Sequence, residues 1–473
     1  MRKPEATHRN GITAWLGVIV LTASTAGGCT IDSPPAISPF PIDVDVSSGP
    51  MMVSLELPDA PEGEDNRALI DTMSPITIID SFRLGGALPQ PRRQTLDIGL
   101  ISASSGAEPV VQARLPAVDT FDIHPCALDG DAEQVECRVG IDNSTEVIQG
   151  ILGADALSRY AVRIDTSAPS LQFFPDIAGN DIIHSRMCEA VFSQPFHGGG
   201  NLVIGGAERP YTGWRVAIGA CFINTREEVR LRLQNPDSEA LWIAPTAGLD
   251  QGLDALFLMS TGIGMTIMSE SSYQRYQQNR PILTGEDPEL PPTGTVTVHL
   301  PNGQLEGRLG TISQISLVSE MSDQRGPCGE RYANHYLERR LECDGESPEL
   351  CPCSDDAAFC RTASAIDLCG EFQVAVVPDS EPLLQGLRDE LRPALPEIDG
   401  IIGTDILRYL RADIDYPNGR IMFDCAAAGD VRCGVRPAVL SRDALEETRT
   451  RCPRPLTCGL PDPDQDVPDK PVP

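Results

Sequence analysis

Basic residues are scarce in this sequence of 473 residues. It has 37 Lys and Arg against 68 Asp and Glu, which gives a formal net charge of −31 at pH 7. A surface with this charge repels the phosphate backbone of nucleic acids and anionic lipid headgroups. We therefore expect no nucleic-acid partner, and we interpret the acidic side chains as a solvated exterior.

Several catalytic and cofactor-binding signatures are also missing. The six His are scattered and no Gly-x-Ser-x-Gly motif occurs, so Ser/His nucleophilic catalysis has no support. The glycine-rich stretch 197–218 has no following Lys-Ser/Thr and no strand–loop–helix context, so it predicts strand, turn and strand rather than a phosphate loop. Cys351 and Cys353 lack the two-residue spacing of zinc ligands, and His335 is the one His nearby. We expect no metal and no cofactor.

Long apolar runs are missing except near the N-terminus. No other stretch approaches the roughly 18 apolar residues that a membrane-spanning helix needs. Near the N-terminus, Arg2, Lys3 and Arg9 precede a short apolar run at 12–23, and small residues then lead to Cys29. This order resembles a bacterial lipoprotein signal, in which the Cys becomes the lipidated first residue.

The resemblance implies a signal peptide at 1–28, lipidation of Cys29 and a flexible, Pro-rich tether at 29–50. The expected location is the bacterial cell envelope, on the outer membrane or cell surface. The lipid anchor would be the membrane contact. Ala26 stands where such signals usually have Leu, and an ordinary cleaved secretory signal is the alternative.

The cysteine count agrees with export. Of 15 Cys, 14 remain without Cys29, and these can form seven disulfides in an oxidising compartment. Cys126 and Cys137 are spaced to close a hairpin over 119–140, and six Cys cluster at 328–369. The other pairings stay open.

Turn residues are plentiful, with 42 Gly and 41 Pro among many short β-branched runs. This composition predicts an all-β protein. We expect a first strand at 52–58, a hairpin at 95–115, strands at 293–300, 310–318 and 372–377, and short helices at 154–160 and 269–279.

One stretch of the chain occurs twice. The segment 68–80, an apolar strand that ends in Asp-Thr, aligns without a gap with the segment that begins at Leu256. Asp71 falls on Ser260 and Thr72 on Thr261, 189 positions later.

A second motif follows each copy. Gly-Ile-Leu-Gly begins at Gly150 and Gly-Ile-Ile-Gly at Gly400, and each precedes an Ile-Asp pair by the same spacing. Two ordered motifs that each occur twice indicate an internal duplication. The offset grows from 189 to 250 positions, so the second copy carries an insertion of 61 residues.

Together these motifs resemble the aspartic peptidases, and the bilobed pepsin-like type fits best. The segment 200–213, with Gly-Gly before Tyr-Thr-Gly, is similar to the family's inter-lobe segment. The resemblance reaches from about residue 52 to 425 and implies a two-lobed, all-β fold. The expected domains are an N-terminal lobe at 51–190, a C-terminal lobe at 191–430 with a Cys-rich insertion at 321–370, and a Cys-containing extension with a disordered tail at 431–473.

The family's mechanism needs two close carboxylates, one from each lobe, which share a proton. One activates water while the other donates to the substrate carbonyl. Asp71 matches the first catalytic position, but the second is Ser260. A hydroxyl cannot hold the shared proton or act as a base at accessible pH. The residues expected to support these two positions are Thr72, Ser74, Thr261 and Gly262.

Two further departures concern the same site. Met73 replaces the Gly of the first motif and is expected to crowd a cleft, and the family's flap Tyr has no clear counterpart between Asp71 and Gly150. We therefore predict a fold that is kept and a catalyst that is lost. As the alternative, Asp71 would be a buried turn carboxylate that accepts backbone N–H bonds.

The sequence thus predicts an exported, lipid-anchored, monomeric protein whose inter-lobe cleft binds a peptide or protein segment without cleaving it. One alternative is an active aspartic endopeptidase that uses Asp71 with an unconventional partner or completes its dyad by dimerisation. Another is a structural or adhesive surface protein whose Cys-rich insertion makes the contacts.

Overall fold

The computed structural model describes the chain in segments. The predicted signal peptide, Cys29, most of the Cys-rich insertion and the C-terminal tail lie outside them. Within the described segments, no helix is long and apolar enough to cross a membrane. The segments are 41–57, 66–80, 92–101, 111–126, 136–174, 191–193, 195–204, 207–223, 253–278, 292–301, 303–318, 363–392, 397–416, 420–426 and 433–437.

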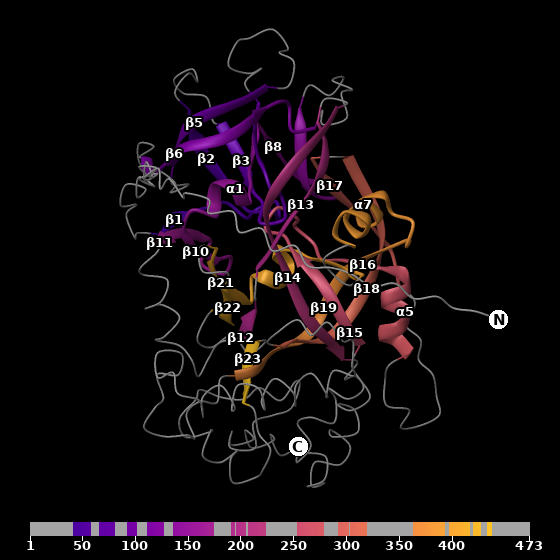
Figure 1. The fold of residues 1–473 in the computed structure, drawn as a ribbon. Coiled ribbons are helices and arrows are strands. Elements are labelled where there is room, and N and C mark those ends of the chain that lie inside the picture. The colour runs from indigo at the N-terminus through magenta and orange to yellow at the C-terminus, as the bar shows by residue number, and fades with distance from the viewer. Residues whose placement is uncertain are drawn as a thin grey trace, which may run out of the picture. The chain divides into compact units, whose positions relative to one another are not determined.

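A closed barrel of six strands contains the first copy of the repeat (Figure 1). The strands are β2 (Met52–Glu56), β3 (Asn66–Ile70), β4 (Thr77–Ile79), β5 (Arg92–Ile101), β6 (Val111–Asp122) and β9 (Gly150–Leu152). β9 runs parallel to β3 and antiparallel to β4, and β4 runs parallel to β6. The short strand β9 therefore lies between the two strands that flank the Asp71 loop.

The second copy repeats this pairing within an 11-stranded sheet. Its strands are β15 (Leu253–Met259), β16 (Ile267–Ser269), β19 (Ala363–Val377) and β20 (Gly400–Ile402). β20 runs parallel to β15 and antiparallel to β16, and β16 runs parallel to β19. Because the same parallel and antiparallel pairs recur in the same order, the predicted duplication is confirmed.

The rest of the large sheet draws strands from both copies. It contains β7 (Cys137–Ile141), β8 (Ser144–Ile148), β13 (Pro195–Ile204), β14 (Ala207–Ile223), β17 (Thr295–Leu300), β18 (Gly303–Val318) and β23 (Cys433–Pro437). β7, which lies between the barrel strands β6 and β9 in sequence, pairs with β17 of the second copy at Val298↔Ile141. The copies are thus joined by backbone hydrogen bonds as well as by packing.

A second, six-stranded sheet also joins the copies. It contains β1 (Ile42–Asp43), β10 (Ala161–Asp165), β11 (Ser170–Phe174), β12 (Val191–Ser193), β21 (Leu410–Asp415) and β22 (Arg420–Cys425). The central neighbours β10 and β21 are equivalent strands of the two copies and pair antiparallel, with Val162 opposite Ile414. Each carries the Ile-Asp pair of the second motif.

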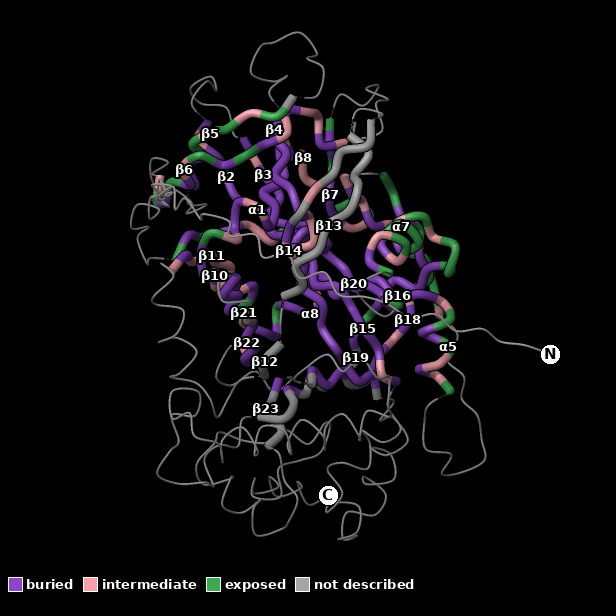
Figure 2. Tube along the Cα trace, in the orientation of Figure 1, coloured by how far each residue is buried: buried purple, intermediate pink, exposed green. Residues whose placement is uncertain are grey.

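The helices within the described segments are short: α1 (Ala154–Leu157), α5 (Glu270–Gln278), α7 (Pro382–Leu391) and α8 (Thr404–Leu407). α1 and α8 begin directly after the glycines that end the two apolar-apolar-Gly motifs. α7 buries Leu384, Leu387 and Leu391, the spacing of an amphipathic helix on an apolar surface. Figure 2 shows the buried segments concentrated in the strands around the two motifs.

Most predicted elements are confirmed. The fold is all-β and duplicated, as expected for a pepsin-like architecture. The hairpin expected at 95–115 is β5–β6, and the glycine-rich stretch forms the antiparallel pair β13–β14. The two predicted helices are α1 and α5, each shorter than expected.

Four predicted boundaries need correction. Residues 42–50 are not a free tether, because β1 pairs with β11 and Ile42 is buried. The segment 119–140 is not one hairpin, because β6 pairs with β4 and β5 while β7 pairs with β8 and β17. The Cys-rich insertion ends before residue 363, where β19 begins. The C-terminal extension supplies β23, which pairs with β19.

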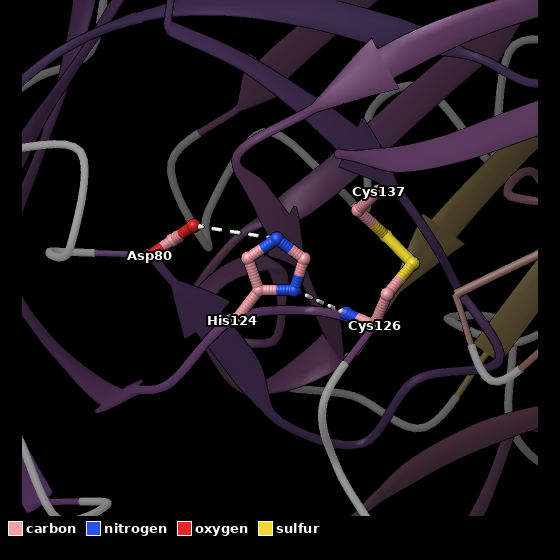
Figure 3. Close-up of a disulfide and its surroundings, with 4 residues drawn as sticks. All are labelled: Asp80, His124, Cys126 and Cys137. Atoms are coloured by element: carbon pink, nitrogen blue, oxygen red, sulfur yellow. Dashed lines mark hydrogen bonds and ion pairs between the residues drawn. A yellow bond between two sulfur atoms is a disulfide. The ribbon is translucent and has the colours of Figure 1, made fainter. Parts of the chain in front are cut away.

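Two disulfides lie entirely within the described segments. Cys126–Cys137 is the pair expected from spacing, and Cys425–Cys433 links the end of β22 to the start of β23. Beside the first bridge, the backbone N–H of Cys126 donates to Nδ1 of His124 at 3.2 Å (Figure 3). Nε2 of the same ring lies 3.8 Å from Oδ2 of the buried Asp80.

Candidate functional site

Asp71 and Ser260 occupy equivalent places at the ends of equivalent strands. Asp71 follows β3, and its N–H donates to the carbonyl of Leu152 at 3.1 Å. Ser260 follows β15, and its N–H donates to the carbonyl of Ile402 at 3.0 Å. In each copy, the strand of the apolar-apolar-Gly motif therefore fixes where the Asp71 or Ser260 loop leaves the sheet.

Two buried threonines tie the loops together. The N–H of Thr72 donates to Oγ1 of Thr261 at 3.2 Å, and the hydroxyl of Thr72 donates to the Met259 carbonyl at 3.0 Å. In return, the hydroxyl of Thr261 donates to the Ile70 carbonyl at 2.7 Å. Both side chains are fully buried, so these bonds lie in a low-dielectric environment where their loss is costly. They hold the two loops in register.

The Ser260 hydroxyl donates to Oδ1 of Asp71 at 2.8 Å. The same oxygen of Asp71 accepts the N–H of Met73 at 2.9 Å, and Oγ of Ser260 accepts the N–H of Gly262 at 3.1 Å. Ser260 is fully buried and Asp71 is 8% exposed. The second copy thus places the Ser260 hydroxyl beside Asp71. This hydroxyl already donates one hydrogen bond and accepts another.

Burial raises the pKa of Asp71 above its ordinary value. Hydrogen bonds from Met73 and Ser260 and the positive charge of Arg215 act in the opposite direction. The Ser260 hydroxyl donates to the Asp71 carboxylate as the protonated acid of a carboxyl dyad would donate to its ionised partner. Unlike a carboxylic acid, Ser260 cannot release that proton to a substrate at accessible pH.

Met73 and Gly262 are equivalent in sequence but not in environment. A Cβ at Gly262 would lie 2.7 Å from Cγ of Asp71, closer than real contacts allow, so this position must stay Gly. Met73 is half-buried, and its side chain packs against an apolar cluster of the second copy that includes Leu256, Met265 and Leu387. Met73 therefore contacts the other copy at the place where the Asp71 and Ser260 loops meet. We call this place the joint between the copies.

Ser74 does not face Asp71 through its side chain. Its hydroxyl donates to the Ile76 carbonyl at 2.8 Å, and its N–H donates to the Asp71 carbonyl at 3.2 Å. Ser74 therefore shapes the turn rather than the carboxylate. The remaining predicted site residue, Cys29, lies outside the described segments.

Arg215 is a site residue that sequence reasoning missed. From β14, its guanidinium donates to the Met73 carbonyl at 2.5 Å and to the Tyr211 hydroxyl at 3.1 Å, and it forms an ion pair with Glu390 of α7 at 2.7 Å. Arg215 is 4% exposed, and burial lowers its pKa to about 10. The available signal was a lone Arg in the otherwise apolar run that follows Trp214.

Two partly buried carboxylates, Asp155 and Asp405, have structural partners. Asp155 accepts hydrogen bonds from the N–H and hydroxyl of Thr77, and Asp405 accepts the same two bonds from Thr266. Burial raises the pKa of each carboxyl to about 6. In the described segments, no group of three or more His, Cys, Asp or Glu side chains could hold a metal ion.

No protein-family model and no curated protein sequence matches the chain. Similar solved structures exist at low identity. Basic 7S globulin from soybean is 12% identical, with 85% of this chain and 98% of that one covered and a TM-score of 0.37. Conglutin gamma, a basic 7S globulin from lupine seeds, is 11% identical over 81% and 93%, with a TM-score of 0.34. An aspartic proteinase from Irpex lacteus is 9% identical over 82% and 97%, with a TM-score of 0.30.

Proposed function

We propose that this protein is an exported, lipid-anchored relative of the pepsin-like peptidases that binds an extended peptide or protein segment and does not cleave it. The observation that carries the proposal is the 2.8 Å hydrogen bond from Ser260 to Asp71, at the place where the peptidase mechanism needs a second carboxylate. Cys29 would carry the anchor and hold the protein at the cell envelope as a monomer.

The chemistry of the pair supports the loss of hydrolysis. Peptide hydrolysis by a carboxyl dyad needs one group that takes a proton from water and another that gives one to the substrate carbonyl. Asp71 can do one of these at a time, and Ser260 can do neither at accessible pH. Oδ1 of Asp71 is also already used by Met73 and Ser260.

The retained scaffold supports binding. The threonine bonds between the loops and the equivalent pairing of β9 and β20 keep the geometry around Asp71 although the second carboxylate is gone. A carboxylate flanked by backbone amides and hydroxyls offers both acceptors and donors to an extended backbone. A ligand of this kind would lie across the joint between the copies.

A cleavage and binding assay tests the proposal. A peptide library would be incubated with the disulfide-formed chain from about pH 3 to pH 7, alongside Asp71→Ala and Ser260→Asp. We expect peptide capture without cleavage by the wild type, and cleavage only after Ser260→Asp. Cleavage by the wild type that Asp71→Ala abolishes would overturn the proposal.

A surface scaffold whose joint takes no ligand is a second candidate. The contact of Met73 with the apolar cluster of the second copy favours it, because a side chain at that position occupies space beside Asp71. Absence of capture by the wild type and by Met73→Gly would favour the scaffold.

The anchor needs its own test. Metabolic labelling with a radioactive fatty acid should label the wild type and fail with Cys29→Ser. Equal labelling of both proteins would remove the lipid anchor from the proposal.

A further inference from the structure

Arg215 links the Asp71 loop to a helix distant in sequence. One nitrogen of its guanidinium bonds the Met73 carbonyl, two residues after Asp71, and the other bonds Glu390 in the last turn of α7. The side chains of Arg215 and Glu390 are 5% and 14% exposed. The third nitrogen, Nε, is buried without a hydrogen-bond partner in the described segments. A buried guanidinium that shares its contacts in this way determines the distance between the loop and the helix.

The charged groups around this link are identifiable. Asp71 and Tyr211 face Arg215 from the loop and from β14, and Asp71 is close enough to act on the charge of Arg215. On α7 itself, Arg388 donates to the Ile398 carbonyl and Asp389 pairs with Arg392. Arg388 also lies 3.6 Å from the exposed Glu397 and donates to the Asp379 carbonyl. Arg215 therefore lies between two carboxylates, Glu390 and Asp71, and is bonded to the first.

We propose that Arg215 is a positioning residue of the candidate site and that Glu390 controls it by gaining or losing a proton. With Glu390 ionised, Arg215 holds the Met73 carbonyl and α7 together, and the Asp71 loop is fixed. With Glu390 neutral, Arg215 turns toward Asp71, the carboxylate that remains beside it. The end of α7 then separates from the loop, and a peptide reaches Asp71 more easily. This inference rests on the proposed function.

Burial of Glu390 favours protonation of its carboxylate near neutral pH. Burial raises the pKa of Glu390 to about 7. The ion pair with Arg215 at 2.7 Å favours the ionised form and acts in the opposite direction. A neutral acid is a weaker acceptor for a guanidinium than a carboxylate is, because the attraction between the two charges is lost. Protonation therefore weakens the link to α7 without removing any side chain.

Two readouts on the full chain test the proposal. Hydrogen exchange would be followed at residues 71–74 and 387–392 between pH 5.5 and 8.5 and expressed as protection relative to the unstructured rate at each pH. We expect protection of both segments to fall roughly fivefold on acidification, the effect of exchanging a charged for a neutral hydrogen bond. In parallel, a fluorescent peptide captured from the library should bind roughly fivefold more tightly at the acidic end.

The variants make the result specific. Glu390→Gln cannot titrate and should remove the pH step, whereas Glu397→Gln, which changes an exposed carboxylate 3.6 Å from Arg388, should keep it. Arg215→Lys keeps the charge but not the planar fork, and should lower protection at every pH. A wild type without a step, or a Glu390→Gln variant with the same step, overturns the proposal. A step in protection without peptide capture at any pH would leave the Arg215 link standing and remove the proposed function instead.

Discussion

The two copies of the repeat agree in the contacts that build their loops. Thr77 bonds Asp155 and accepts the N–H of Gly153, while Thr266 bonds Asp405 and accepts the N–H of Gly403, each glycine contact at 3.1 Å. At another equivalent pair of positions, the backbone N–H groups of Arg67 and Leu256 donate to the side chains of Gln149 and Asp399. Each of these contacts lies within one copy and has its equivalent in the other.

The copies differ at several residues around the Asp71–Ser260 contact, although the threonines that bond across it, Thr72 and Thr261, are alike. Asp71 faces Ser260, Met73 corresponds to Gly262, and Ser74 corresponds to Ile263. In the part of the chain that the structure describes, α7 of the second copy reaches this contact through the ion pair of Glu390 with Arg215 of β14. The comparison separates two kinds of constraint. Residues that close a loop on its own sheet are alike in the two copies, as are the two threonines that tie the loops together, whereas the residues at and beside the Asp71–Ser260 contact differ.

Substitutions at the equivalent positions Gly262 and Met73 should show the largest difference in stability between the two copies. Gly262→Ala places a Cβ 2.7 Å from Cγ of Asp71, and we expect it to cost up to about 3 kcal/mol of unfolding free energy. Chemical denaturation followed by tryptophan fluorescence would measure the loss. The matched variant Met73→Gly removes a half-buried side chain and should cost about 1 kcal/mol. Equal costs for the two variants would contradict the asymmetry.

Removing the equivalent scaffold carboxylates should have a large and similar effect in both copies. Asp155→Ala and Asp405→Ala each leave the N–H and hydroxyl of a buried threonine without their acceptor, so we expect each to cost about 2 kcal/mol. Denaturation at pH 7.5 would compare them, with the Asn variants as controls that keep an acceptor oxygen. If one Ala variant were nearly neutral, the two copies would not be equivalent in energy.

The same comparison shows what the sequence predicts and what it does not. The ungapped repeat aligns Asp71 with Ser260, and a pepsin-like duplication places such positions opposite each other, so the pairing could be anticipated. Arg215 and Glu390 could not, because they are 175 positions apart and neither belongs to a repeated motif. The repeat cannot predict a contact that one copy makes and the other does not, because no second copy of its residues occurs in the sequence.

Strand pairing between the copies was equally hidden. Alternation of apolar and polar residues identifies a strand but not its partner. It therefore gave the hairpin β5–β6, whose strands are close in sequence, and missed the pairing of β7 with β17, at Val298↔Ile141. The Pro-rich segment before residue 50 was interpreted from composition, although Ile42 and Val44 supply the apolar residues that pack it against the core.

Removing the Ser260 hydroxyl tests the side-chain pair, Asp71 and Ser260, at which the two loops differ and touch. Ser260→Ala removes the donor to Asp71 and should cost about 1 kcal/mol at neutral pH, since one hydrogen bond to a buried carboxyl is lost. It should also raise the pKa of Asp71 further, because Ser260 lowers it in the native protein. Denaturation and a carboxyl NMR titration would measure the two effects. An unchanged pKa of Asp71 would contradict the role assigned to Ser260.

The last comparison concerns the pH dependence that Asp71 contributes to stability. Its pKa is raised from 3.8, mainly by burial, so the folded protein binds the proton more readily than the unfolded chain. This contribution is fully present below about pH 3.8 and is lost as the pH rises through the folded pKa. Met73, Ser260 and Arg215 oppose the effect of burial on this pKa.

Asp71→Asn keeps an acceptor oxygen and cannot titrate, so its stability relative to the wild type should increase as the pH rises through this range. In a Ser260→Ala background the opposition is weaker, so the same comparison should give a larger difference that extends to higher pH. Denaturation at a series of pH values in the four proteins measures both slopes. Identical slopes with Asp71 and with Asn at that position would mean that the carboxylate is not buried as the contacts between the two copies require.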